Sequence, residues 1–284
     1  MAPEIVRTRE ELRAALGDAR PGLVPTMGAL HAGHESLISR SASENAVTVV
    51  SVFVNPIQFS NHDDLARYPR NLAQDVARAH EASADLVFAP EVETIYPPGF
   101  DTTVEVGDLT ERWEGASRPG HFRGVATIVT ILLNLVRPAR SYFGEKDYQQ
   151  LQVIRRLHRD LALPGFIVGC ATVRDQDGLA LSSRNVQLSP EDRLRALALP
   201  RAIETVVDAA AAGESDARRL EEMALIALDV PGLVVDYLAL VDGSSLEPLP
   251  HVRAGARLLV AVDVGGTRLI DNAAIEPPPS GTVQ

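Results

Sequence analysis

Short apolar runs alternate with longer amphipathic segments through the first part of the chain. The runs have the length of β-strands, and the segments between them carry apolar residues at spacings of three and four, which predicts helices. This alternation is typical of βαβ units, so we predict an α/β fold with a Rossmann-like, doubly wound parallel sheet. The predicted strands are 22–26, 46–54, 85–89, 141–143 and 166–173, and the predicted helices are 34–43, 72–83, 125–136 and 147–161.

The pattern changes after Val173. A polar stretch, 174–185, is followed by two Ala/Leu/Glu-rich helical segments and then by strand-like segments, two of which meet at Gly265-Gly266. This mixture predicts a Rossmann-like domain over 1–173 and a smaller, lid-like C-terminal α+β domain over 174–284. The helical segments are 190–212 and 215–228, the strand-like segments are 234–240, 257–264 and 268–275, and the Pro/Gly/Ser-rich tail 277–284 is expected to be loose.

Composition and charge narrow the range of partners and compartments. The 284 residues are 45% hydrophobic and 23% charged, which is typical of a globular protein. The formal net charge of -11 disfavours a nucleic-acid partner, because an acidic surface repels phosphate backbones. One cysteine, Cys170, permits no intrachain disulfide, and without a secretory signal we expect a cytoplasmic protein. The longest apolar run, 128–136, is too short to span a membrane, so no membrane association is expected.

The segment Pro25-Thr-Met-Gly-Ala-Leu-His31-Ala-Gly-His34 carries the strongest candidate chemistry, where a predicted strand ends and a predicted helix begins. Gly28 and Gly33 let the backbone approach a ligand closely, and the start of the helix offers N–H groups and a positive dipole end to phosphate. Two imidazoles three residues apart can face the same ligand. They could donate hydrogen bonds to an α-phosphate as negative charge builds on it.

Other interpretations of this segment can be compared with the residues. A phosphate-binding P-loop requires Lys and then Ser or Thr after the second glycine, whereas Gly33 is followed by His34 and Glu35. A zinc protease requires a histidine at position 38, which is Ile38. Two loop histidines can also simply cap or pack, but the strand-turn-helix context with both glycines favours a phosphate site.

Two later strand ends carry further polar residues. Gln58 follows the buried second strand, and its amide can donate to and accept from a small hydroxy acid, although glutamines beyond strands are often ordinary loop residues. After the fourth predicted strand, Gly144-Glu145-Lys146-Asp147 opens a helix that also carries Gln150. Lys146 can neutralise triphosphate charge, and Asp147 can cap the helix or hold a ribose. A salt-bridged helix start is the alternative interpretation.

A third candidate, Leu181-Ser182-Ser183-Arg184, lies in the polar stretch between the predicted domains. Two hydroxyls and a guanidinium group can form a small anion-binding segment that closes over the β- and γ-phosphates of ATP. A simple turn with a helix-capping serine is the alternative, and the position at the domain junction favours the phosphate role.

Taken together, these segments resemble the pantothenate synthetase family, a member of the nucleotidyltransferase group with a His-x-Gly-His signature. The resemblance implies a ligase in which the pantoate carboxylate attacks the α-phosphorus of MgATP, pyrophosphate leaves, and the amine of β-alanine then attacks the pantoyl-adenylate and releases AMP. It implies a homodimer and no tightly bound organic cofactor. The matching segments, in the order of the family, are 25–34, 50–59, 68–70, 119–122, 143–151, 173–185 and Asp271-Asn272.

The same resemblance assigns roles to individual residues. His34 would be the proton donor, with His31 assisting and Lys146 as a third catalytic residue. Gln58 and Gln150 would bind pantoate, with Gln58 also near β-alanine. The residues that would bind ATP are Met27, Gly28, Ala29, Leu30, His31, Ala32, Gly33, His34, Gly144, Glu145, Lys146, Asp147, Val173, Leu181, Ser182, Ser183 and Arg184.

The sequence departs from the family pattern at two places. The family commonly has methionine where Leu181 stands, a change that conserves volume and should be tolerated. Some relatives have an acidic pair where this chain has Gln74 and Asp75, so Asp75 is the one candidate ligand for Mg²⁺. Because Mg²⁺ usually keeps several waters and binds substrate phosphates, we expect ATP to hold most of it. Cys170, in an apolar strand, is expected to be structural.

Three other functions share some of these features. Adenylyl or cytidylyl transferases share His-x-Gly-His but keep the nucleotide on the product, and the two glutamines with Gly-Glu-Lys-Asp favour the ligase. Aminoacyl-tRNA synthetases share the signature too, but this chain is short and acidic. A non-catalytic metal- or nucleotide-binding protein would use His31, His34, His62 and His80, which lack any recognised zinc spacing.

Overall fold

The computed structural model describes residues 2–59 and 62–277, which form two compact units. The N-terminal unit comprises the chain up to Glu145 together with Gln149–Thr172. The C-terminal unit comprises Lys146–Tyr148 and the chain from Val173 onward, so it includes four residues, 146–148 and Val173, of the first predicted domain. Most of the predicted loose tail, residues 278–284, lies outside the described residues.

A six-stranded parallel sheet forms the centre of the N-terminal unit, in the order β1-β4-β3-β2-β5-β6. Most residues of its inner strands are buried, as a parallel sheet covered by helices on both faces requires. The predicted α/β fold with a doubly wound sheet is therefore confirmed. The strands are β1 (Glu4–Val6), β2 (Gly22–Thr26), β3 (Thr48–Val52), β4 (Leu86–Phe88), β5 (Arg140–Gly144) and β6 (Phe166–Cys170).

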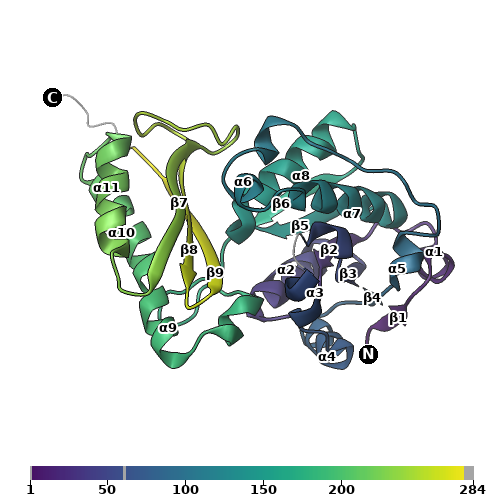
Figure 1. Cartoon of the computed structure of the whole chain (residues 1–284). Helices are drawn as coiled ribbons and strands as arrows, with labels where there is room; N and C mark the ends of the chain where they lie inside the picture. The colour runs from purple at the N-terminus through teal and green to yellow at the C-terminus, as the bar shows by residue number, and fades with distance from the viewer. Residues whose placement is uncertain (1, 60–61, 278–284) are drawn as a thin grey trace. The chain divides into compact units, whose positions relative to one another are not determined.

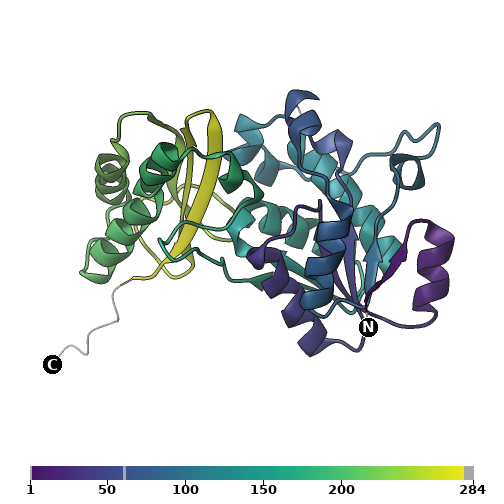
Figure 2. The same ribbon diagram turned by 90° about the horizontal axis from the view of Figure 1, so that it is seen from below.

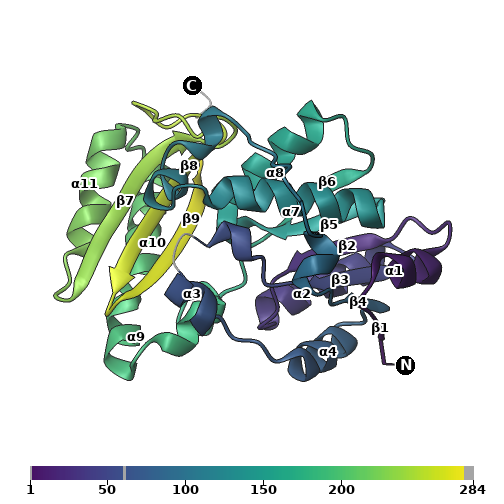
Figure 3. The ribbon, with the colours of Figure 1, turned by 45° about the vertical axis from the view of Figure 1, so that its right-hand side comes forward.

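Helices cover both faces of this sheet. In Figures 1 and 3, α2 (Ala32–Glu44) and α4 (Leu72–Glu81) lie on one face, and α7 (His121–Val136) and α8 (Tyr148–Asp160) lie on the other. Chain direction explains this, because the connections through α2 and α4 step one way along the sheet and those through α7 and α8 step the other way. The shorter helices are α3 (His62–Arg67), α5 (Val92–Ile95), α6 (Glu114–Ser117) and 3₁₀ turns at Pro56–Gln58, Asp108–Thr110 and Glu145–Asp147.

The first strand and helix of the chain were not predicted. Strand β1 has three residues and buries only Val6, and α1 (Arg9–Leu16) buries only Leu12 and Leu16, so neither produces a long periodic pattern. A capping box between Thr8 and Glu11 begins α1, and this pattern could have predicted the start of the helix from the sequence. Strand β6 also ends earlier than predicted, at Cys170, because its neighbour β5 ends at Gly144 directly opposite.

The C-terminal unit contains three antiparallel strands, β7 (Leu233–Asp242), β8 (Ala256–Val264) and β9 (Thr267–Ile275). The two-residue turn between β8 and β9 uses Gly265 and Gly266, both at positive φ, as a tight hairpin requires. Helices α10 (Ala198–Ala211) and α11 (Ala217–Leu228) cover one face of this sheet, as Figures 1 and 2 show, and bury a shared apolar core against it.

The predicted single helix 190–212 is wrong, because it is two helices, α9 (Pro190–Ala196) and α10, separated at Leu197. Pro200 accounts for the break. Proline lacks an N–H group and its ring clashes with the carbonyl four residues earlier, so a continuous helix through Ala196 is disfavoured, whereas proline is tolerated in the first turn of a new helix.

Candidate active site

The candidate site of the N-terminal unit lies at the carboxyl end of its sheet. Strands β2 and β5 are adjacent, yet the chain leaves them in opposite directions along the sheet, which makes this point the topological switch of the fold. Ligands of doubly wound sheets bind at such a switch, outside the carboxyl ends of the strands. Met27–His34 follows β2, and Gly144 ends β5.

The turn after β2 has an unusual backbone that its neighbours hold in place. Gly28 and Ala29 both have positive φ, at 84° and 51°. The Thr26 hydroxyl donates to the carbonyl of Ser51 at 2.7 Å and accepts from the N–H of Gly28 at 3.1 Å. A Cβ atom on Gly28 would lie 2.7 Å from a carboxylate oxygen of Asp75, so glycine is required for both its conformation and its space.

Asp75 fixes the next part of this turn. Its carboxylate, on a residue only 2% exposed, accepts from the N–H of Leu30 at 2.7 Å and from the N–H of Ala29 at 3.2 Å. Both oxygens therefore already bind backbone donors. This arrangement favours a positioning role for Asp75 over the role of Mg²⁺ ligand that we expected from the sequence.

The two histidines of the signature lie side by side at the start of α2. Their ring centroids are 4.1 Å apart, which agrees with the proximity predicted from their spacing. His31 is the N-cap residue, and its Nδ1 accepts from the N–H of Gly33 at 3.1 Å. A neutral His31 ring therefore carries its proton on Nε2, where it can donate to a ligand.

Gln58 is buried and its amide is oriented by two neighbours. Its Nε2 donates to Met27 Sδ at 3.0 Å, and its Oε1 accepts from Asn55 Nδ2 at 3.0 Å. Asn55 is 1% exposed, also donates to the carbonyl of Gly124 at 3.1 Å and accepts from the Tyr96 hydroxyl at 2.7 Å. The Gln58 amide has a further N–H and a further lone pair, which suit a hydroxyl or carboxylate group.

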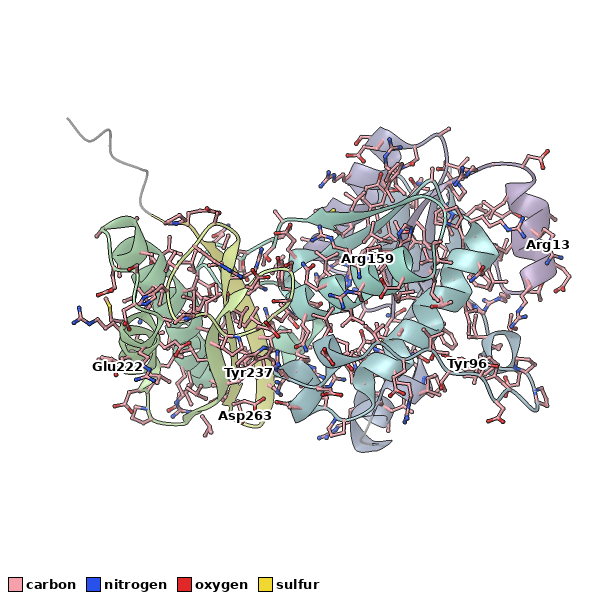
Figure 4. The ribbon with its side chains drawn as sticks, turned by 90° about the horizontal axis from the view of Figure 1, so that it is seen from above. Arg13, Tyr96, Arg159, Glu222, Tyr237 and Asp263 are labelled. Atoms are coloured by element: carbon pink, nitrogen blue, oxygen red, sulfur yellow. The ribbon has the colours of Figure 1, made fainter. Side chains whose placement is uncertain are left out.

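Asn55 and Tyr96 orient the candidate residue Gln58, and neither was assigned a role from the sequence. Burial raises the pKa of Tyr96, so its hydroxyl stays protonated and keeps donating to Asn55. Figure 4 labels Tyr96 in the N-terminal unit. Asn55 could have been recognised in the sequence as a polar residue at the end of an apolar strand. Tyr96 lies 41 residues away from it, and no sequence pattern pointed to their contact.

The two adjacent glutamines of α8 have different environments. Gln149 is buried, and its side chain donates to the carbonyls of Leu109 and Arg112 and accepts from the N–H of Glu114, so it holds the loop before α6. Gln150, the predicted pantoate-binding residue, is half-buried. Gln149 therefore has a structural role, whereas the role predicted for Gln150 stays a prediction.

The segment after β5 is divided between the two units. Gly144 and Glu145 belong to the N-terminal unit, and Lys146 and Asp147 to the C-terminal unit. Lys146 Nζ lies 3.4 Å from Asp147 Oδ1, and the lysine side chain is 19% exposed. The turn Glu145–Asp147 is 3₁₀, and α8 begins after it at Tyr148.

The remaining predicted ATP residues lie in the C-terminal unit, at the ends of a narrow backbone loop. The N–H of Leu181 donates to the carbonyl of Val173 at 3.0 Å, which closes the loop. The Ser182 hydroxyl accepts from the N–H of Arg184 at 3.2 Å and so caps a 3₁₀ turn over Ser183–Gln187, as in the alternative interpretation. Ser183 and Arg184 are half-buried.

Four further observations bear on the expectations from sequence. Within residues 2–59 and 62–277, no group of three or more His, Cys, Asp or Glu side chains could hold a metal ion. The side chain of His62 lies outside the described part of the structure. Cys170 is buried, and burial raises the pKa of its thiol. Among the helices that the structure describes, none is long and apolar enough to cross a membrane.

Comparison with known proteins identifies relatives of nearly the whole chain. A model of the pantoate-beta-alanine ligase family matches residues 4–274. The chain is similar to the pantothenate synthetase of Thermus thermophilus, with 54% identity over 275 residues that cover 96% of this chain and 99% of the relative. It is also similar to the pantothenate synthetase of Rhizorhabdus wittichii, with 50% identity over 282 residues that cover 97% of this chain and 100% of the relative.

Solved structures give the same result. A crystal structure of pantothenate synthetase from Thermus thermophilus matches with a TM-score of 0.94 and 52% identity, covering 96% of this chain and 100% of that chain. A crystal structure of pantoate-beta-alanine ligase from Francisella tularensis, complexed with beta-gamma ATP and beta-alanine, matches with a TM-score of 0.80 and 33% identity, covering 96% of this chain and 98% of that chain.

Proposed function

The chain belongs to the pantoate–β-alanine ligase family, and from this membership we propose that it activates pantoate with MgATP and joins the activated acid to β-alanine. The observation that carries the proposal is the pair of adjacent imidazoles of His31 and His34 at the start of α2, beside a turn whose backbone is fixed by Asp75. Such a helix start suits an anionic ligand, and preorganised donors there stabilise charge that develops during phosphoryl chemistry.

The reaction has two steps that balance without a covalent enzyme intermediate. A carboxylate oxygen of pantoate attacks the α-phosphorus of ATP, and the bond to the bridging oxygen breaks, so pyrophosphate leaves. The amine of β-alanine then attacks the carbonyl carbon of pantoyl-adenylate, and AMP leaves with the electron pair of the anhydride bond. The protein contributes alignment of the reactants and stabilisation of charge.

We assign roles to residues as follows. His34 donates a proton or hydrogen bond to the α-phosphate with help from His31, and Lys146 neutralises phosphate charge. Gln58 and Gln150 bind pantoate, and the fixed amide of Gln58 supports this assignment. The proposed ATP-binding residues are those of Met27–His34, Gly144, Glu145, Lys146, Asp147, Val173, Leu181, Ser182, Ser183 and Arg184.

Magnesium enters this proposal as part of the substrate MgATP. Both Asp75 oxygens accept backbone N–H groups, and the metal prefers phosphate oxygens and water. We further propose a homodimer, from the family resemblance, and a cytoplasmic location, because the one cysteine is a buried free thiol that a reducing compartment preserves. Light scattering on the purified protein tests the dimer.

Nucleotide product analysis tests the function. The protein is incubated with MgATP and pantoate, with and without β-alanine, and AMP, ADP and pyrophosphate are followed. We expect AMP and pantothenate only when all three substrates are present. Pyrophosphate without AMP, formed when another phosphorylated substrate replaces pantoate, would instead indicate a nucleotidyltransferase, and no turnover with any substrate would indicate a binding protein.

A further inference from the structure

Asn272 on β9 holds the main chain of Lys146. Its Nδ2 donates to the carbonyl of Lys146 at 2.9 Å, and Asn272 is only 4% exposed. Both residues belong to the C-terminal unit, although they are 126 positions apart. A buried amide that binds the carbonyl of the lysine fixes where the lysine side chain begins.

Arg257 on β8 fixes the orientation of the Asn272 amide. Its Nε donates to Asn272 Oδ1 at 2.7 Å, and its guanidinium lies 3.7 Å from the ring centroid of Tyr148. Because arginine can only donate, the oxygen of the Asn272 amide must face Arg257 and the NH₂ group must face Lys146. The segment Lys146–Tyr148 is therefore held at its first residue by Asn272 and at its last by Arg257.

Asp271, the preceding residue of β9, holds a second segment. Its fully buried carboxylate accepts two hydrogen bonds from Arg174, at 2.6 and 3.0 Å. Arg174 also donates to the carbonyl of Gly178 at 3.1 Å, and so braces the loop that leads into Leu181–Arg184. The carboxylate raises the pKa of the Arg174 guanidinium, so the pair remains charged.

Adjacent residues of a strand point to opposite faces of a sheet, so one dipeptide can hold two different segments. We propose that Asp271-Asn272 is a positioning pair, in which Asn272 places Lys146 and Asp271 places Leu181–Arg184 for the phosphates of ATP. This inference rests on the proposed function, because it acts through residues assigned to ATP there.

Two substitutions at Asn272 test the contact with Lys146. Asn272→Asp keeps an acceptor for Arg257 but loses the donor to the Lys146 carbonyl and places negative charge beside it. Asn272→Ala loses both the donor to Lys146 and the acceptor for Arg257 without adding charge, and serves if the aspartate variant does not fold. We expect each to lower the turnover number of pantoate-dependent exchange between pyrophosphate and ATP by about tenfold to a hundredfold, because small displacements of a charge-stabilising group cost rates of that order.

Arg268 on the same strand and the same face as Asn272 gives a matched control. Arg268 donates a hydrogen bond of 2.6 Å to Asp236, and its guanidinium lies over the ring of Tyr237, which Figure 4 labels. Like Arg257, it therefore combines a side-chain hydrogen bond with a contact to a tyrosine ring. Arg268 and Asn272 are four residues apart along the strand, which places them about 13 Å from each other. Arg268→Ala should leave the exchange rate at the wild-type value, and a loss as large as that of Asn272→Asp would overturn the positioning role.

A double substitution separates this inference from the proposed function. If Asn272 acts through Lys146, Asn272→Asp should add little to the defect of Lys146→Ala. An inactive wild-type protein would refute the proposed function, whereas an active wild type with a slow Lys146→Ala variant and a fast Asn272→Asp variant would refute only the positioning role. Full additivity of the two losses would refute it as well.

The role of Asp271 is tested through the KM for ATP, the substrate to which residues Leu181–Arg184 are assigned. Asp271→Asn removes the charge that holds Arg174 but keeps one acceptor. We expect the KM for ATP to rise about tenfold while the KM for β-alanine stays unchanged, because only the phosphate-binding segment is released. An equal rise in both values, or no rise in either, would overturn this half of the proposal.

Discussion

The carboxylate of Asp75 accepts a hydrogen bond of 2.7 Å from the backbone N–H of Leu30, 45 residues earlier in the chain. The same carboxylate accepts from Ala29, whose backbone is at positive φ. The contact joins the fourth residue of α4 to the turn that ends in the two signature histidines. The geometry of this turn therefore depends on a helix that follows a different strand.

Asp75→Asn should weaken ATP use without changing the requirement for Mg²⁺. An asparagine keeps one acceptor but turns its NH₂ group toward a backbone N–H, which costs about 1–3 kcal/mol of stability for the unpaired donor. We expect a raised KM for ATP and a lower unfolding free energy, measured by steady-state kinetics and urea titration. Gln74→Ala, at the exposed neighbouring position, is the control. A selective shift of the Mg²⁺ dependence would instead support the metal-ligand role.

Gly124→Ala should displace Gln58. A Cβ atom at position 124 would lie 2.6 Å from the Cα of Gln58 and from the carbonyl oxygen of Ile57, so the 3₁₀ turn Pro56–Gln58 or the helix α7 must move. Overpacking of this kind costs about 1–3 kcal/mol. We expect the KM for pantoate to rise more than the KM for ATP. Asn134→Ala, at an exposed position of the same helix, should change neither value.

Tyr142 should make the protein sensitive to alkaline pH. Its buried hydroxyl donates to Glu44 at 2.8 Å and accepts from Asn45 at 2.7 Å, and burial first, with the Glu44 contact second, raises its pKa to about 12. The unfolded side chain ionises near pH 10, so the stabilisation is complete below about pH 10 and is lost as the pH rises toward 12. The unfolding free energy of wild type should fall more steeply between these values than that of Tyr142→Phe. Equal slopes would contradict the assignment.

The sequence predicted the parts of this molecule that depend on local patterns. The buried runs of β2 and β3 and the turn from Pro25 to His34 could be recognised because each carries its own signal of apolar residues or glycines. The break at Leu197 could also have been predicted from Pro200, but the long run of helix-forming residues around it suggested a continuous helix.

The contacts that orient the site could not be predicted in this way. The contact of Asn55 with Tyr96 and that of Asn272 with Lys146 form only when the fold brings together segments that are far apart in the sequence. Asp75 shows the same limit. The acidic pair of some relatives suggested Asp75 as a metal ligand, whereas in the structure its backbone partners favour a different role.

His31 caps α2 and has a proposed role at the α-phosphate, and a pair of substitutions distinguishes the two. As the N-cap of α2 it accepts from the N–H of Gly33, and as an imidazole beside His34 it is assigned to the α-phosphate. Asparagine is a good N-cap residue and alanine is a poor one, with a difference of about 0.5–2 kcal/mol. His31→Asn should therefore keep the wild-type unfolding free energy while His31→Ala loses that amount, and both should slow adenylate formation. If His31→Asn kept full activity, the residue would serve only to cap the helix, and the proposed phosphate role would pass to His34 alone.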